Sequence, residues 1–249
     1  MNLNLDSDYY SDKTLVSNSM LGRMTENIRL FALWMEGRYE YPSSSHFVLG
    51  DYFHTLILEP HKLESKFLMA DVSSRNTKAY KDLIEEAGNK DVITRPEYYM
   101  AKNMSENIMA HDILREVIEE SEHEVPAVNE VFGIKCKGKA DMVWDVDGVR
   151  IIADLKSTSK YVTDFEKYAY IYGYHRQAAM YMELFDADEF WFIPSEKAFP
   201  YTPALYRYGR NSEFFRNGMN RLERDLSTYR TMFIEGQYNL NDLLIVEDI

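Results

Sequence analysis

The sequence contains one cysteine in 249 residues, and this scarcity excludes several classes of site. Cys136 alone cannot form an intrachain disulfide, and one thiolate cannot supply the four cysteines that usually hold an iron–sulfur cluster. Long apolar runs are also missing, because no stretch of about 18 residues is apolar enough for a transmembrane helix. The first residues lack the basic-then-apolar order of a signal peptide. We therefore expect a cytoplasmic protein that does not associate with membranes.

Positive charge is scarce as well. The 28 lysines and arginines are outnumbered by 41 aspartates and glutamates, which gives a net charge of −13. Proteins that hold nucleic acid by electrostatics are usually basic, so the composition by itself argues against such a partner. The objection is weaker for an enzyme, because a metal site requires carboxylates and a local basic groove can lie within an acidic surface.

The predicted elements indicate an α/β protein. There is no internal repeat, low-complexity tract or Gly/Ser linker, so residues 1–249 are predicted to form a single domain. Capping residues and the helical spacing of apolar positions predict several helical segments. The first covers residues 17–59, with a break near 41–45 and caps at Ser43 to Ser45. The others cover residues 78–87, 95–120, 164–185 with an interruption at Gly173, and 211–233. These helices precede, interrupt and follow a short antiparallel sheet, which makes an α/β sandwich.

The strands are predicted from composition. Residues 125–155 are rich in Val, Ile, Phe and Trp and contain a turn pair, and shorter strands are predicted at 190–193 and 204–208. We therefore expect a helical annex over residues 1–60 and a core of strands and helices over residues 125–210.

Two aspartates are predicted to meet across a β-hairpin. The pair Asp147-Gly148 is typical of a two-residue type I′ turn, which fixes the register of the flanking strands. Counting back from this turn places Asp141 directly opposite Asp154. Opposed carboxylates repel each other unless a positive charge lies between them. We therefore expect a divalent cation, and the oxygen ligands favour Mg²⁺ or Mn²⁺.

Lys156 is predicted to lie beside this cation. Residues 154 and 156 project to the same face of a strand, while Leu155 points into the core. An ammonium group there can orient an attacking water, help to deprotonate it, and offset charge that develops on the phosphorane. The pattern Asp, then Asp-x-Lys, is therefore suited to phosphodiester cleavage. The alternative is a solvated pair of charges at a strand edge.

Gln177 and Tyr181 share one face of the helix predicted over residues 164–185, because they are four residues apart. Their polar groups are candidates for holding a DNA strand near the scissile phosphate. The alternative, an ordinary amphipathic helix with a polar or half-buried face, is common.

Lys135, Lys137 and Lys139 recur at every second position before Asp141. They form a basic row on one strand face if no bulge intervenes at Gly138. Contacts with DNA phosphates are one interpretation, and a solvated charged face is the other.

Residues 133–140, GIKCKGKA, stop one residue short of a phosphate-binding loop. That loop requires Ser or Thr where Ala140 stands, and the hydroxyl is needed to hold Mg²⁺. A strand rather than a helix is predicted to follow, so backbone amides would not converge on a phosphate. We do not expect ATP binding.

Together these motifs resemble the PD-(D/E)xK nucleases, and in particular the exonuclease VIII, or RecE-like, branch. The resemblance is carried by KGKAD at 137–141, IADLKST at 152–158 and YHRQAAMY at 174–181. The upstream segments YY at 9–10, VSNSML at 16–21 and LGDYFHTLILEP at 49–60 are similar to the amino-terminal pattern of that branch. The resemblance therefore covers most of the chain. It implies a three-layer sandwich with a mixed central sheet and an N-terminal helical annex.

The resemblance also implies roles for individual residues. Asp141 and Asp154 match metal ligands, Lys156 matches a catalytic lysine, and Gln177 and Tyr181 match substrate-positioning residues.

Two further residues gain a role only from the resemblance. His54 matches a histidine that helps to hold the metal, although a lone histidine on an apolar helix is more often a core residue. Glu130 matches an additional catalytic acid, and its alternative is a surface charge at a strand end.

The implied function is that of a Mg²⁺-dependent DNA exonuclease. Similar proteins digest duplex ends from 5′ to 3′ and leave a 3′ overhang for a strand-annealing partner in phage or prophage recombination. A ring-like homo-oligomer is expected, because an acidic monomer would hold DNA poorly. The alternatives are a single-strand or flap nuclease of the same fold and a catalytically idle DNA-binding module.

Overall fold

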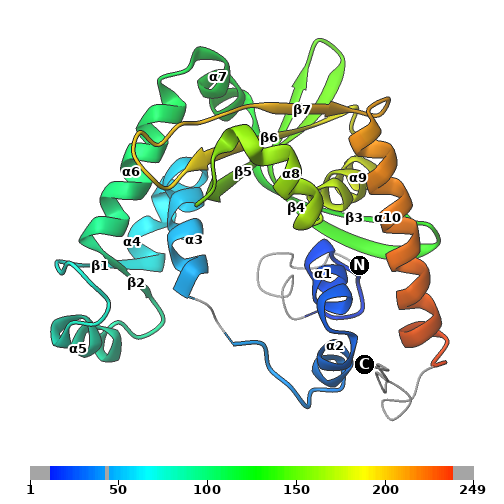
Figure 1. Ribbon diagram of the computed structural model, residues 1–249, viewed down its shortest axis with the longest axis horizontal. Helices are drawn as coiled ribbons and strands as arrows, with labels where there is room; N and C mark the ends of the chain where they lie inside the picture. Colours follow the sequence, from blue (N-terminus) through cyan, green and yellow to red (C-terminus); the bar gives the residue numbers. More distant parts are fainter. Residues whose placement is uncertain (1–11, 43–44, 238–249) are drawn as a thin grey trace, which may run out of the picture.

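The computed structural model describes residues 12–42 and 45–237, and its centre is a five-stranded mixed sheet (Figure 1). The strand order is β3-β4-β5-β6-β7, which is also the order along the chain. The strands span β3 Glu122–Val131, β4 Ile134–Val146, β5 Val149–Thr158, β6 Glu189–Glu196 and β7 Tyr206–Gly209. Strands β5 and β6 are parallel and the other neighbours are antiparallel. The sheet is therefore mixed, as the resemblance implied, and a purely antiparallel description is wrong at β5–β6.

Helices cover both faces of this sheet and make a three-layer α/β sandwich (Figure 1). One face packs against α9 Tyr174–Phe185, which in turn packs on α10 Glu213–Tyr229. The other face packs against α3 Ser45–Leu58, α6 Arg95–Met109 and α7 Asp112–Glu120. Each interface holds its own apolar cluster, and strand alternation divides β5 between them, with Ile152 in the first and Leu155 in the second.

Two glycines allow the helical layer on the α9 side to approach closely. A Cβ atom at Gly138 of β4 would lie 2.7 Å from Leu184 and 3.3 Å from the Tyr181 ring. A Cβ atom at Gly218 of α10 would clash with the backbone of His175. Gly138 introduces no bulge, because the β3–β4 register is constant along the strands. Its role is to make room for α9.

The N-terminal part of the described chain joins the sandwich at the free edge of β4. Val16 forms a parallel bridge with Cys136, and Ser17 caps α1 Asn18–Glu26 by accepting from the Met20 amide. Helix α2 Ile28–Met35 follows, and its cap, Asn27, accepts from the Leu30 amide. Ser43 and Ser44, predicted as caps, and the tyrosine pair at 9–10 lie outside the described residues.

Several elements differ from the sequence-based expectation. The helix predicted over 95–120 is two helices, α6 and α7, because the chain is extended at His111 between them. The closing helix becomes a π-helix at η3 Arg230–Ile234. A small parallel sheet of β1 Phe67–Ala70 and β2 Asp91–Thr94 was not predicted. Its strands are four residues long and are separated by α5 Lys78–Glu86, so period-two alternation has little length in which to show.

Other short elements connect the layers. They are η1 Pro60–Lys62 and α4 Leu63–Lys66 after α3, and η2 Val162–Asp164 and α8 Phe165–Ile171 before α9. The interruption predicted at Gly173 is confirmed, because this residue has a φ of 71° and separates α8 from α9. In the part of the chain that the structure describes, no helix has the length and apolar character needed to cross a bilayer. The division into one domain with an annex over residues 1–60 stays a prediction.

Candidate active site

The hairpin that carries the two aspartates has the predicted register. Both residues of its turn have positive φ, 51° and 79°, as a type I′ turn requires. The β4–β5 ladder then runs without a bulge until Met142 stands opposite Ala153. The next residues along the two strands are Asp141 and Asp154. The aspartates therefore lie at the point where this ladder ends.

Beyond that point the two strands separate. Within the described residues, β5 continues to Thr158 beside β6, whereas β4 continues beside β3 and is bridged by Val16 on its other edge. At the fork, the Leu155 amide donates to Asp141 Oδ2 over 2.9 Å. A carboxylate thus replaces a backbone carbonyl of the ladder, and this fixes the position of Asp141.

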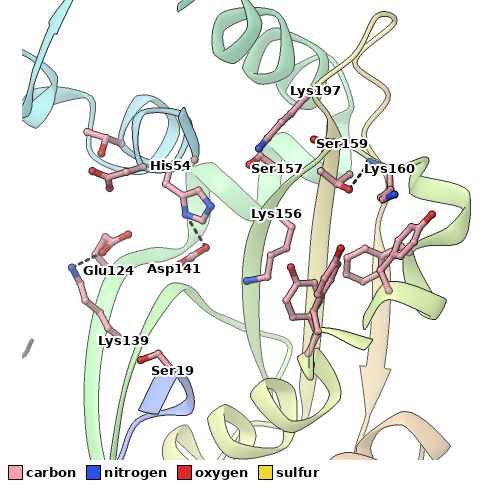
Figure 2. A pocket seen from close by; sticks show the side chains of 18 of the residues that line it. Ser19, His54, Glu124, Lys139, Asp141, Lys156, Ser157, Ser159, Lys160 and Lys197 are labelled. Carbon is pink, nitrogen blue, oxygen red and sulfur yellow. Dashed lines mark hydrogen bonds and ion pairs between the residues drawn. The ribbon is translucent and has the colours of Figure 1, made fainter. Parts of the chain in front are cut away.

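His54 reaches the same carboxylate from α3. Its Nδ1 lies 3.2 Å from Asp141 Oδ2 (Figure 2). The neighbouring Phe53 is fully buried in the core, while the His54 side chain is 26% exposed and lines a cavity. His54 is therefore not a core residue of the apolar cluster, and it faces the site.

Asp154 is held from two sides and is almost fully buried. Its Oδ1 accepts from Gln177 Nε2 of α9 over 2.5 Å. Its Oδ2 forms an ion pair with Lys156 Nζ, 2.5 Å away, and has no other partner within the described residues. Gln177 therefore contacts Asp154 and is buried, whereas the sequence suggested that it would face substrate.

These contacts shift the ionisation of the cluster. Burial raises the pKa of Asp154 to about 6, against the opposing effect of Lys156. For Asp141, burial also acts upward, but the charge and hydrogen bond of His54 outweigh it and the pKa is lowered. Burial lowers the pKa of His54, yet Asp141 more than offsets this and the pKa is raised. For Lys156, burial acts downward, but Asp154, Tyr174 and Asp141 together outweigh it, so its pKa is raised.

A cavity of about 860 Å³ opens over this cluster, and its two sides differ in composition. The carboxylate side comes from α3, α4 and the β3–β4 pair and consists of Asp51, Glu59, Lys66, Glu124 and Lys139. The tyrosine side comes from the chain that follows β5 and β6 and from α8 and α9, and consists of Lys160, Tyr168, Tyr172, Tyr174 and Lys197. In Figure 2, Glu124 and Lys139 lie on one side, Lys160 lies on the other, and Lys156 lies between them.

Glu124 is the acidic residue that the sequence analysis missed. In the β3–β4 register it would face Asp141, but this pair is absent from the ladder and Glu124 has a φ of 54°. At the same place, the side chains of β4 pass from one apolar cluster to the other. Ala140 packs in the cluster under α9, and Met142, two residues later, packs in the cluster under α6. The distortion turns Glu124 into the cavity, where its Oε2 lies 2.5 Å from Lys139 Nζ.

Glu130, by contrast, is not among the residues that line the cavity. It is exposed near the other end of β3, opposite Lys135 in the register. Six residues of strand separate it from Glu124, which corresponds to about 20 Å. Glu124 rather than Glu130 is therefore the additional acid near the aspartates.

The three lysines of the basic row have different surroundings. Lys139 lines the cavity beside Glu124, and Lys135 is exposed. Lys137 is buried and donates to the Asp12 carbonyl over 2.5 Å, and burial lowers its pKa. The row is thus formed, but it does not present three ammonium groups to one surface. Tyr181 lines the cavity, as its predicted role requires.

Within the described residues, no three His, Cys, Asp or Glu side chains already form a metal cage. The donor set nevertheless fits a divalent cation. Asp141 and Asp154 supply carboxylate oxygens, His54 supplies an imidazole nitrogen, and the buried Asp154 Oδ2 has only the Lys156 ammonium as a partner within the described residues. A buried carboxylate oxygen that only one ammonium contacts has lone pairs left over, and these can bind a metal cation.

Comparison with known proteins agrees with this geometry. The model of a PDDEXK-like domain of unknown function (DUF3799) matches residues 17–237. The chain belongs to this family. The match confirms the prediction of the PD-(D/E)xK nuclease family and of its fold, and the pattern of Asp141, Asp154 and Lys156 agrees with the motif in the family's description. No curated protein matches the chain.

Solved structures add a likeness of fold. A putative exonuclease from Eubacterium rectale is 17% identical with a TM-score of 0.67, and the alignment covers 100% of this chain and 96% of that one. A phage-related exonuclease from Haemophilus somnus 129PT is 13% identical with a TM-score of 0.38, covering 75% and 95%. An alkaline exonuclease from Laribacter hongkongensis is 12% identical with a TM-score of 0.34, covering 78% and 100%. The first of these likenesses supports the fold.

Proposed function

We propose that the protein is a divalent-metal-dependent deoxyribonuclease. The observation that carries the proposal is the convergence of His54, Asp141, Asp154 and Lys156 where β4 and β5 separate, at the floor of a cavity. Membership of a PD-(D/E)xK-like family supports the same reaction. The other explanation, a solvated charge pair at a strand edge, is disfavoured because the Asp154 side chain is 5% exposed and the Lys156 side chain 20%.

Asp141, Asp154 and His54 would hold the cation. When bound, Mg²⁺ or Mn²⁺ supplies Lewis acidity toward the phosphate and lowers the pKa of a coordinated water. The two carboxylates suit either ion, and an imidazole ligand favours the softer Mn²⁺. We therefore expect Mn²⁺ to support activity at least as well as Mg²⁺.

The protein's own side chains would do the remaining work. Lys156 is not a metal ligand as an ammonium, and it is placed to orient the attacking water and to offset charge on the phosphorane. Gln177 would keep Asp154 oriented through its hydrogen bond to Oδ1, so that Oδ2 faces Lys156 and the cation. Tyr181 and Lys139, both at the cavity, are candidates for contacts with the substrate.

We propose exonucleolytic digestion of DNA ends in the 5′ to 3′ direction, in phage or prophage recombination beside a strand-annealing protein. The fold that the chain shares with a putative exonuclease supports an end-directed activity. A ring-like homo-oligomer would let an acidic protein stay on DNA, and light scattering measures its mass. A single-strand or flap nuclease has the same catalytic residues and is the second candidate.

Digestion of DNA labelled at one end tests the proposal. The wild-type protein is incubated with duplexes labelled at the 5′ or the 3′ end, with the matching single strands and with a flap substrate, in Mg²⁺, in Mn²⁺ and in EDTA. We expect cleavage with either metal and none in EDTA. The label released first as mononucleotide gives the direction. A protein that binds these substrates but cleaves none of them would be the catalytically idle module.

A further inference from the structure

We propose that the tyrosine side of the cavity binds unpaired nucleotides, so that the strand held at Lys156 is single-stranded next to the scissile phosphate. This inference rests on the proposed function and adds the class of substrate to it. Three features of the described residues carry it: a run of tyrosine rings, two lysines that have no carboxylate partner, and the opposite character of the facing side.

The rings form a continuous surface that starts at the catalytic lysine. Lys156 Nζ lies 4.9 Å from the centre of the Tyr174 ring. The Tyr172 ring follows at 5.8 Å from Tyr174, and the Tyr168 ring follows at 6.3 Å from Tyr172 with an angle of 29° between their planes. Lys160 Nζ ends the run, 6.0 Å from the Tyr168 ring. A strand that lies along this surface would meet a ring at each step away from Lys156.

The exposure of these rings differs along the run. Tyr174 is half-buried and stacks on Phe165 and Phe192, so its position is fixed by the core. Tyr172 is 57% exposed, which leaves a large part of its ring open to a ligand. Aromatic rings of this kind stack with nucleic-acid bases without sequence preference, because every base has a π-face.

The lysines on this side have no acidic partner. Within the described residues, no carboxylate lies at ion-pair distance from the ammonium of Lys160 or Lys197, and burial lowers the pKa of Lys197. The acids that line the cavity, Asp51, Glu59, Glu124 and Asp141, all come from the opposite side or the floor. In a protein with a net charge of −13, two uncompensated lysines at one wall favour an anionic ligand there.

The carboxylate side of the cavity explains why we expect a single DNA strand rather than a duplex. Its lysines are already paired, since Lys66 lies near Asp51 and Glu59, and Lys139 lies beside Glu124. A duplex in the cavity would bring its second backbone toward these carboxylates without free cations to hold it. In a duplex the base faces are also covered by neighbouring base pairs. Stacking on tyrosine therefore requires bases that are unpaired.

An apolar protein interface is the competing explanation, since Ile171 and Tyr161 near this wall are 67% and 73% exposed. Three observations favour nucleotides instead. The tyrosines line a cavity rather than a flat surface, the wall ends in cations, and the run begins at Lys156. The experiment below separates the two partners.

Binding in EDTA isolates the tyrosine side from cleavage. The probes are a fluorescein-labelled oligothymidine of about 12 nucleotides, an abasic strand of equal length and a duplex, and anisotropy measures their affinity. The test variant is Tyr172→Leu, with Tyr172→Phe as the aromatic replacement. The matched control is Tyr99→Leu, because Tyr99 lies on α6 outside the cavity and is 54% exposed.

We expect Tyr172→Leu to weaken oligothymidine binding about fivefold or more. Tyr172→Phe and Tyr99→Leu should bind like wild type, and the abasic strand should bind wild type and Tyr172→Leu equally. The proposal is overturned if Tyr172→Leu binds oligothymidine normally, or if it loses affinity equally for the abasic strand. It is also overturned if the variant changes the mass measured by light scattering, since this indicates a contact between protein chains.

Cleavage kinetics separate this inference from the proposed function. With Mg²⁺ or Mn²⁺, Tyr172→Leu should raise KM for the single strand about fivefold and leave kcat nearly unchanged, because the tyrosine binds ground state and transition state alike. If wild type cleaves DNA and the variant has an unchanged KM, the inference alone fails. If wild type cleaves nothing, the proposed function fails, and the EDTA measurements still decide whether the wall binds unpaired bases.

Discussion

The two sides of the cavity contain similar numbers of lysines but use them differently. On the carboxylate side, Lys66 and Lys139 neutralise acids of the protein itself. On the tyrosine side, Lys160 and Lys197 have no carboxylate at ion-pair distance within the described residues. The difference shows why net charge is a poor guide to the ligand of a site, since an acidic protein can still offer a wall where cations are uncompensated.

The largest expected effect is at the floor that both sides share. Asp154→Asn should abolish metal-dependent cleavage on every substrate, because the amide removes the charge that holds the cation but keeps the shape of the side chain. The fold should persist, with a melting temperature in EDTA close to that of wild type. Asp145→Asn is the control, since Asp145 lies on the partner strand β4 of the same hairpin but is exposed and pairs with Arg150. Near-normal turnover of Asp154→Asn would show that the metal site lies elsewhere.

Lys156→Ala should reduce kcat by about 10²-fold or more, with metal affinity nearly unchanged. The ammonium is not a ligand, so its removal costs transition-state stabilisation rather than cation binding. Calorimetry of Mn²⁺ binding and initial rates on the same preparation measure both quantities. A loss of metal affinity as large as the loss of rate would assign Lys156 a structural role and would break the distinction between the floor and its two sides.

His54→Gln separates a metal ligand from a packed core residue. If His54 is a metal ligand, the variant should bind Mn²⁺ more weakly than wild type. In EDTA, the pKa of His54 is raised in the folded protein, so protonated His54 stabilises the fold. This stabilisation is present at pH values below the pKa of His54 in the unfolded chain, and it is lost as the pH rises through the pKa in the folded protein. The variant should therefore melt about 2–4 °C lower at about pH 6 and like wild type at about pH 9.

The exposed His61 gives the control for this measurement, as His61→Gln should change neither metal binding nor melting. A core histidine would instead lower the melting temperature of His54→Gln equally at both pH values and leave Mn²⁺ affinity intact.

The prediction with the smallest expected effect compares the two sides of the cavity directly. Lys160→Gln should reduce the salt dependence of single-strand binding by about one phosphate contact and weaken binding a few-fold. Lys139→Gln should change the salt dependence less, because Lys139 already neutralises Glu124. Binding in EDTA at several salt concentrations gives both slopes. Equal slopes for the two variants would mean that pairing in the free protein does not predict which lysines meet DNA.

The elements that sequence predicted correctly depend on short-range chemistry. The Asp147-Gly148 turn fixes the register of β4 and β5, so the neighbouring positions of Asp141 and Asp154 follow by counting. Gly173 breaks the helix between α8 and α9 because it takes positive φ. The small sheet of β1 and β2 was missed because its strands are short and pair across an intervening helix.

The parts that sequence could not predict depend on contacts between distant segments. Glu124 reaches the cavity because β3 is distorted opposite Asp141, whereas the family resemblance had pointed to Glu130. Gln177 turned out to support Asp154, since the distance of α9 from the sheet is set by Gly138 and not by the helix itself.

The hairpin, its turn and the identity of the candidate metal ligands and of Lys156 follow from the sequence alone, because a turn type and strand alternation are properties of adjacent residues. The packing of distant segments decides where the ladder opens, which acid joins the aspartates and which lysines have no carboxylate partner within the described residues. These features depend on where β3, α3, α8 and α9 pack against the hairpin, and charge compensation between residues far apart in the chain has no signature in local sequence.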